Sequence, residues 1–290
     1  MGGGHWDAQA YDSYTKCTYS VDASTFASGS YSSQEIFTAR YIADELKPYN
    51  VMRECCDSDE HPNSFPVILA LDVTGSMGHT AVEVAQKLNE IMTTLYEDKE
   101  VQDVEFCIMA VGDLACDQEP IQISQFESDV RIADQLGKVY FEYGGGGNTY
   151  ESYTAAWYMG ARHCALDCWK RGGKGVIITM GDECPNPYLP HGRLNRLTGD
   201  TLEKDVDSAE LLNEVRKKYD VYHIAVDDRT YRHHKEDYNC NGKWRELLGQ
   251  NYFIENLDSI ATRIIEIIKT AYKGESIFIP KVNENNEIIW

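Results

Sequence analysis

The stretch Pro66-Val-Ile-Leu-Ala-Leu-Asp72, followed by Val73-Thr-Gly-Ser-Met-Gly78, decides the fold that the sequence predicts. A short, continuously apolar run that ends in a carboxylate is typical of a strand buried on both faces. Beyond the glycines, apolar residues recur at helical spacing from Val84 to Leu95. Strand, tight turn and helix together are the opening of a βα unit.

The same pattern repeats along the chain. Further strands are expected at 104–111, 175–179, 221–226 and 252–254, and helices at 149–170, 207–219, 244–248 and 257–272. Alternating βα units over roughly 210 residues predict an α/β fold of three layers, a mostly parallel central sheet with helices on both faces.

The sequence divides into three parts. Residues 1–64 are expected to be a Ser/Tyr-rich extension, an arm without periodicity over 1–33 followed by a short helix over 33–46. Residues 65–272 form the α/β domain, in which 184–200 is expected to be a Pro-rich loop. Residues 273–290 are a tail or an edge strand.

The charge balance narrows the classes of partner. Lys and Arg number 27 against 47 Asp and Glu, a formal net charge of −20. A polyanion is repelled by nucleic-acid backbones and by anionic membranes, so neither is expected as a partner. Residues 66–200 hold 20 of the acids and 10 of the bases, which directs the search for a site to this part of the chain.

Cysteine use and targeting signals predict a cytoplasmic protein. Nine cysteines cannot all pair within the chain, and no C-x-x-C occurs, so free thiols in a reducing compartment are favoured over a zinc site. The N-terminus lacks the basic and apolar regions of a signal peptide, and no run of 18 apolar residues is present.

Oxygen-bearing side chains gather where the expected strands end. In open α/β sheets, ligands bind outside the carboxyl ends of the strands. The acids at those ends are Asp72, Asp113, Asp182 and Asp227, and nearby loops add the hydroxyls of Thr74, Ser76 and Thr149. This hard, oxygen-only set favours Mg²⁺ over zinc or copper. Asp113, Asp117 and Asp227 are interpreted as solvated loop acids.

Three motifs resemble those of von Willebrand factor A domains. Leu71-Asp-Val-Thr-Gly-Ser-Met-Gly78 resembles the D-x-S-x-S motif, with Thr74 in place of the first Ser. Gly-Gly-Asn-Thr149 is similar to the loop that presents the family's metal-binding Thr, and Val176-Ile-Ile-Thr-Met-Gly-Asp182 to the strand that ends Thr-Asp-Gly. The resemblance covers roughly residues 65–272.

The resemblance implies a metal-ion-dependent adhesion site. Its ligands would be Asp72, Thr74, Ser76, Thr149 and Asp182, holding Mg²⁺ or alternatively Mn²⁺ or Ca²⁺. The acidic group of a protein partner would complete the coordination. Met180 stands where the family has its third-motif Asp, and Asp182, two residues later, is expected to replace it.

Three function classes follow. The leading one is a non-enzymatic, Mg²⁺-dependent protein-binding domain of an intracellular complex, which family analogy would place beside an ATPase. The second is a metal-dependent hydrolase or phosphotransferase that uses Asp113, Asp182 or Glu183 with the same ion. The third is a scaffold that has lost its metal and binds through the N-terminal arm.

Overall fold

The computed structural model describes residues 4–98, 101–143, 150–226, 239–275, 281–282 and 288–289. Its centre is a six-stranded sheet in the order β12-β11-β7-β2-β3-β4. The strands are β2 (Phe65–Asp72), β3 (Val104–Val111), β4 (Ile121–Ile123), β7 (Gly175–Gly181), β11 (Tyr219–Val226) and β12 (Tyr252–Glu255). Only the edge strand β4 runs antiparallel to its neighbour, so the predicted mostly parallel α/β sheet is confirmed.

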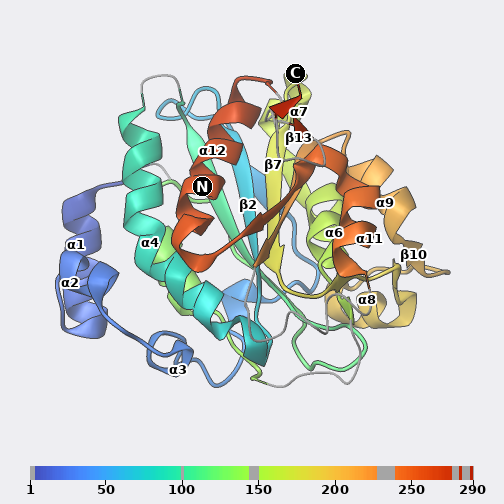
Figure 1. Cartoon of the computed structure of the whole chain (residues 1–290), viewed down its shortest axis with the longest axis horizontal. Coiled ribbons are helices and arrows are strands. Elements are labelled where there is room, and N and C mark those ends of the chain that lie inside the picture. Colours follow the sequence, from blue (N-terminus) through green and yellow to red (C-terminus); the bar gives the residue numbers. More distant parts are fainter. Residues whose placement is uncertain are drawn as a thin grey trace.

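Helices cover both faces of the sheet (Figure 1). One face carries α4 (Gly78–Glu97), α5 (Arg131–Gly137) and α12 (Ile260–Tyr272). The other carries α6 (Thr154–Arg162), α9 (Ser208–Val215) and α11 (Cys240–Leu248). The short 3₁₀ turns are η1 (Asp44–Leu46), η2 (Gly75–Met77), η4 (Gly249–Asn251) and η5 (Leu257–Ser259).

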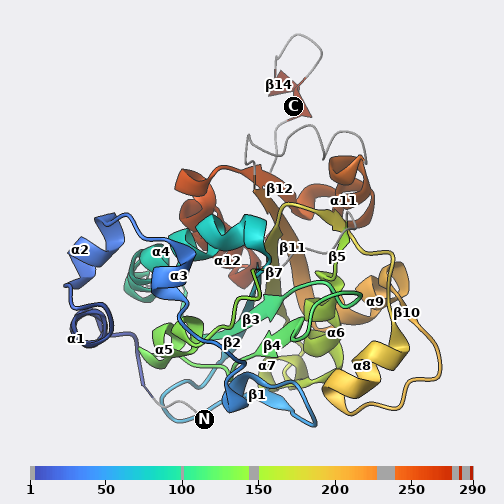
Figure 2. The ribbon, with the colours of Figure 1, turned by 90° about the horizontal axis from the view of Figure 1, so that it is seen from below.

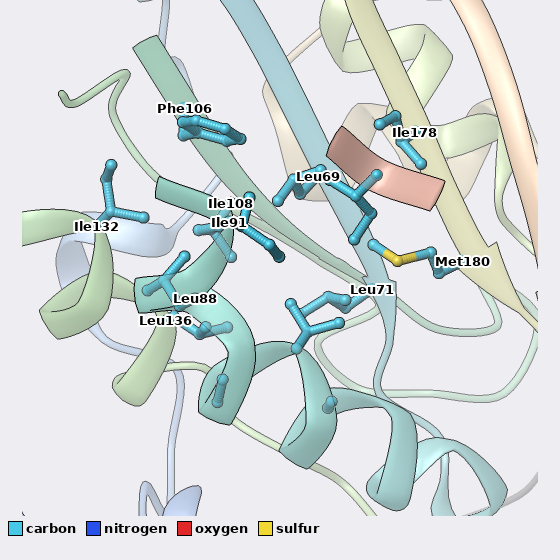
Figure 3. Packing of buried hydrophobic residues seen from close by; sticks show 14 of the residues in the cluster. Leu69, Leu71, Leu88, Ile91, Phe106, Ile108, Ile132, Leu136, Ile178 and Met180 are labelled. Carbon is cyan, nitrogen blue, oxygen red and sulfur yellow. The ribbon is translucent and has the colours of Figure 1, made fainter. Parts of the chain in front are cut away.

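The core has two halves because β2 sends alternate side chains to opposite faces. Leu69 and Leu71 pack into the cluster under α4, whereas Ile68 and Ala70 pack into the cluster under α6. Figure 3 shows Leu69 and Leu71 beside Met180 in the first cluster. A strand buried on both faces has no polar side, which is why its sequence is apolar throughout until Asp72.

The N-terminal arm is helical, which the sequence did not predict. It contains α1 (Ala8–Tyr19) and α2 (Ala23–Ser28), capped by the side chains of Asp7 and Asp22. Both pack on α4, where the Gln86 amide donates hydrogen bonds of 2.7 and 2.8 Å to the carbonyls of Phe26 and Gly29. The arm therefore lies on the domain through specific contacts.

The helix expected over 33–46 is two short pieces, α3 (Ser33–Ile36) and η1. The Glu35 carboxylate and Ser32 form a capping box that starts α3. Phe37 then leaves helical geometry and packs against Phe141, with ring centroids 4.5 Å apart. This tertiary contact outweighs the helical preference of the segment.

Two other segments differ from the expectation. The helix predicted over 149–170 is divided into α6, β6 (Cys164–Leu166) and α7 (Asp167–Lys170), because β6 pairs in parallel with β1 (Arg53–Cys55). The loop expected over 184–200 contains β8 (Cys184–Pro185), β9 (Tyr188–Leu189) and α8 (His191–Thr198). The remaining strands are β5 (Tyr150–Glu151), β10 (Val206–Asp207), β13 (Lys281–Val282) and β14 (Ile288–Ile289); β13 and β14 pair with each other.

One disulfide departs from the expectation of free thiols. Cys184 in β8 and Cys240 at the start of α11 are joined, 56 residues apart in sequence. The other seven cysteines are unpaired. None of the described helices combines the length and the apolar composition that a membrane crossing requires.

Candidate functional site

Asp72 ends β2 at the carboxyl edge of the sheet and is almost fully buried. One carboxylate oxygen, Oδ1, accepts hydrogen bonds from the Thr74 backbone N–H at 2.9 Å and hydroxyl at 2.6 Å. The other, Oδ2, accepts one from the Tyr153 hydroxyl at 2.7 Å. Burial, followed by the neighbouring carboxylate of Asp182, raises the pKa of Asp72 to about 7.

Asp182 is brought close to Asp72, as the shifted third motif predicts. Since β2 and β7 pair in parallel, the residues that follow both strands meet at the same edge. Met180 instead points into the apolar cluster beside Leu71 (Figure 3). Gly181 lets the Tyr153 ring approach the end of β7 closely, because a Cβ there would lie 2.1 Å from the Tyr153 hydroxyl.

The other predicted ligands are placed less fully. The Thr74 side chain is buried at the site, and the backbone of Ser76 belongs to η2, directly before α4. The Ser76 side chain, Thr149 and Asp227 lie outside the described residues. The structure thus brings together Asp72, Thr74 and Asp182, and the ligand roles of all five residues stay predictions.

Glu151 is a part of the site that the sequence reading missed. It lies in β5, which pairs in parallel with β8 so that Glu151 faces Pro185, just beyond Asp182. Its side chain is buried, and its Oε2 has no hydrogen-bond partner among the described residues. Burial and then the charge of Asp72 raise the pKa of Glu151 to about 10. Its position two residues after Thr149 was the available signal.

Asp113 and Asp117 are not solvated, contrary to the expectation. Their exposed fractions are 4 % and 8 %. The Asp117 Oδ2 accepts the backbone N–H of Asp113 at 2.7 Å, which folds the loop after β3 back on itself. Burial raises the pKa of Asp117. We use the name acidic edge for Asp72, Asp113, Asp117, Glu151 and Asp182.

Two buried aromatic side chains, Tyr153 and Trp244, support the acidic edge through hydrogen bonds. Besides its bond to Asp72, the Tyr153 hydroxyl accepts the backbone N–H of Glu183 at 3.1 Å, so it connects the loops after β2 and β7. The Trp244 indole N–H donates a hydrogen bond of 3.0 Å to the Glu183 carbonyl. The indole also stacks on the His223 ring, with ring centroids 3.7 Å apart. Nothing in the spacing of Tyr153 or Trp244 distinguished them from core aromatics.

The donor set fits a hard divalent cation. Asp72 and Asp182 offer two buried carboxylates beside the Thr74 hydroxyl, and Glu151 at the same edge has a buried oxygen without a hydrogen-bond partner among the described residues. Across the described part of the chain, no three His, Cys, Asp or Glu side chains are arranged to hold a metal by themselves. A cation here would depend on hydroxyl oxygens and water as well as carboxylates.

Similarity to other proteins is found in the structure and not in the sequence. The sequence matches no protein-family model and no curated protein. The structure is similar to the pilus adhesin SpaC from Lactobacillus rhamnosus GG, with a TM-score of 0.52 at 11 % identity, covering 75 % of this chain and 31 % of that one.

Two further similar structures have lower TM-scores. The vWF domain of the type V pili tip protein Mfa5 from Porphyromonas gingivalis gives 0.46 at 11 % identity, covering 75 % of this chain and 98 % of that one. Proximal thread matrix protein 1 from the mussel byssus, described with a zinc-occupied MIDAS motif, gives 0.42 at 10 % identity, covering 74 % and 48 %. The chain thus shares its fold, a mostly parallel sheet between two layers of helices, with the SpaC adhesin, and the resemblance of the motif at Asp72 to von Willebrand factor A domains agrees with this fold.

Proposed function

We propose that the chain is a divalent-cation-dependent protein-binding domain. The cation, Mg²⁺ first with Mn²⁺ and Ca²⁺ as alternatives, would be held at the acidic edge by Asp72, Thr74, Ser76, Thr149 and Asp182. The acidic side chain of a partner protein would supply a further oxygen ligand. When bound, the cation would provide the attraction that a chain of net charge −20 lacks for an acidic group.

The observation that carries this proposal is the environment of Asp72. Its carboxylate is buried at the end of a central strand, beside the carboxylate of Asp182, and is contacted by hydroxyl groups. Two buried acids without a cation oppose folding. A bound dication would offset this unfavourable free energy. Metal binding therefore explains the two neighbouring buried acids, which packing alone does not.

We propose binding rather than catalysis for the same edge. His223, on β11, would be the obvious general base, but it is fully buried. One ring nitrogen, Nδ1, is 2.8 Å from the Thr179 hydroxyl, and the ring stacks on Trp244. A base held in this way cannot reach a substrate in a surface cleft.

Selection from a random peptide display library tests the proposal. The immobilised protein is loaded with Mg²⁺, and bound peptides are eluted with EDTA. We expect the eluted peptides to share an Asp or Glu, and Asp72→Ala to retain none of them. The control Asp167→Ala removes an acid at the opposite end of the sheet and should behave as wild type. Recovery that is independent of Mg²⁺ and of Asp72 would contradict the proposal.

A further inference from the structure

Beside the acidic edge lies a basic cavity of about 580 Å³, which we call the arginine pocket. Its lining comes from the loop after β3, from α8 and from a residue just before β10. The polar residues in it are His191, Arg193, Arg196 and Asp205. Helix α8 contains two arginines, a histidine and no acid, in a chain with a strong acidic excess.

The arginine pocket and the acidic edge share one loop. The Arg193 guanidinium donates hydrogen bonds through Nη2 to the carbonyls of Asp117 and Gln118, the latter at 3.1 Å. Asp117 belongs to the acidic edge and binds the backbone of Asp113. In Figure 1, α8 lies at the same end of the sheet as the first turn of α4, which follows the Asp72 loop. Figure 2 shows α4 and α8 on opposite sides of β2, β3 and β4.

The Arg196 guanidinium is the positively charged group of the arginine pocket that is available to a ligand. It is exposed, and it makes no hydrogen bond or ion pair within the described ranges. The acids beside the pocket are already engaged: Asp205 with the His191 ring at 2.7 Å, Asp113 with the backbone N–H of Ala115 at 2.9 Å, and Asp117 with the backbone of Asp113. Arg193 and Arg196 are three residues apart on one helix, so their side chains share a face.

We propose that the arginine pocket binds a second acidic side chain of the same partner segment whose first acid reaches the cation. This inference rests on the proposed function. A guanidinium group binds a carboxylate through two parallel hydrogen bonds, which a lysine cannot reproduce. The partner is therefore an acidic peptide segment with two acids a few residues apart, one for the metal and one for Arg196.

The pocket also explains how a strongly acidic domain selects an acidic partner. Long-range repulsion from a net charge of −20 is screened within about 8 Å at physiological salt. Two local positive centres, the cation and Arg196, act at shorter range. A peptide with a single acid would use one of them, and a peptide with two acids would use both.

The test repeats the library selection on wild type and on Arg196→Ala in parallel. Peptides eluted from wild type should carry a second Asp or Glu within five residues of the first, which spans up to roughly 17 Å when extended. Peptides from Arg196→Ala should lack that enrichment. Lys170→Ala, which removes one positive charge at the opposite end of the sheet, should give the wild-type pattern.

A synthetic peptide from the wild-type selection then gives the energetic coupling. Replacing its second acid with Gln or Asn should weaken binding to wild type about tenfold and to Arg196→Ala less than twofold. Arg196→Lys should lie between the two. Equal weakening in wild type and Arg196→Ala, or single-acid peptides from both selections, would overturn the pocket while leaving the metal-dependent binding intact. Failure to recover any EDTA-eluted peptide would contradict the proposed function and this inference together.

Discussion

Acidic side chains lie at both ends of the central sheet, but the groups that surround them differ. At the amino end, Arg131 binds Asp129 through Nε and Nη2, each at 2.8 Å, and the His61 ring lies 3.4 Å from Asp103. At the carboxyl end, Asp72 is contacted by hydroxyl groups, and Glu151 has a buried oxygen without a hydrogen-bond partner among the described residues. Asp129 and Asp103 at the amino end therefore have basic partners within the chain, whereas the carboxyl end holds acids that a cation would complete.

The largest expected effect concerns a second difference between the ends, the disulfide at the carboxyl end. Cys184 and Cys240 close a long loop and join α11, which supports Glu183 through Trp244, to β8. Replacing both with Ser should lower the free energy of unfolding by about 4 kcal/mol, because the unfolded chain regains the entropy of that loop.

Urea denaturation of the double variant measures this loss. The control is Cys17→Ser, which removes an exposed free thiol and should leave stability unchanged. Titration of the unreduced, denatured wild type with a thiol reagent should count seven free thiols of the nine cysteines. A count of nine would contradict the pairing.

The next effect tests the contrast in neutralisation directly. Glu151→Gln should stabilise the protein in EDTA by about 3 kcal/mol at pH 7, since it removes an uncompensated buried acid. Asp129→Asn, at the amino end, should destabilise by about 1 kcal/mol because it breaks a paired acid. Urea unfolding of both variants in EDTA checks the opposite signs; the same sign for both would break the comparison.

A further effect concerns Glu105, an amino-end acid without an Arg or Lys partner among the described residues. Burial raises the pKa of Glu105 to about 7. An acid whose folded pKa exceeds its unfolded value of about 4.5 binds its proton more tightly when folded, so stability is lost as the pH rises from 4.5 to 7.

The shift in pKa from 4.5 to about 7 corresponds to about 3 kcal/mol, and because solvent partly screens this carboxylate, Glu105→Gln should gain about 2 kcal/mol relative to wild type between pH 4.5 and pH 8. Urea unfolding at several pH values gives the difference curve. A flat difference curve for Glu105→Gln would mean that the carboxylate is solvated at this end.

The domain fold was predictable because its strands are buried on both faces. Runs such as 66–72 and 104–111 are apolar without interruption, and few alternatives to a parallel central strand fit them. Helices α1 and α2 were missed because their buried side chains are aromatic and polar residues such as Tyr11 and Thr15, which give weak periodicity. The Asp residues that cap these helices are visible in the sequence, but an N-cap residue alone does not predict a helix.

The site was predictable only where a ligand follows a strand. Asp72, Thr74 and Asp182 come together because parallel pairing fixes which loops share an edge. The burial of Glu151 and of Asp117 depends on the path of β5 and of the loop after β3, which the local sequence does not determine. The disulfide likewise depends on the contact between α11 and β8, two elements far apart in the chain.

Thermal unfolding with and without Mg²⁺ tests the central claim most directly, namely that the carboxyl end holds a divalent cation. At a Mg²⁺ concentration 100 times the dissociation constant, binding should stabilise wild type by about 2.7 kcal/mol and raise the midpoint by roughly 5 °C over the EDTA value. Asp72→Asn should show no rise, while Asp129→Asn should show the wild-type rise. An unchanged midpoint for wild type, or an equal rise in Asp72→Asn, would contradict the account.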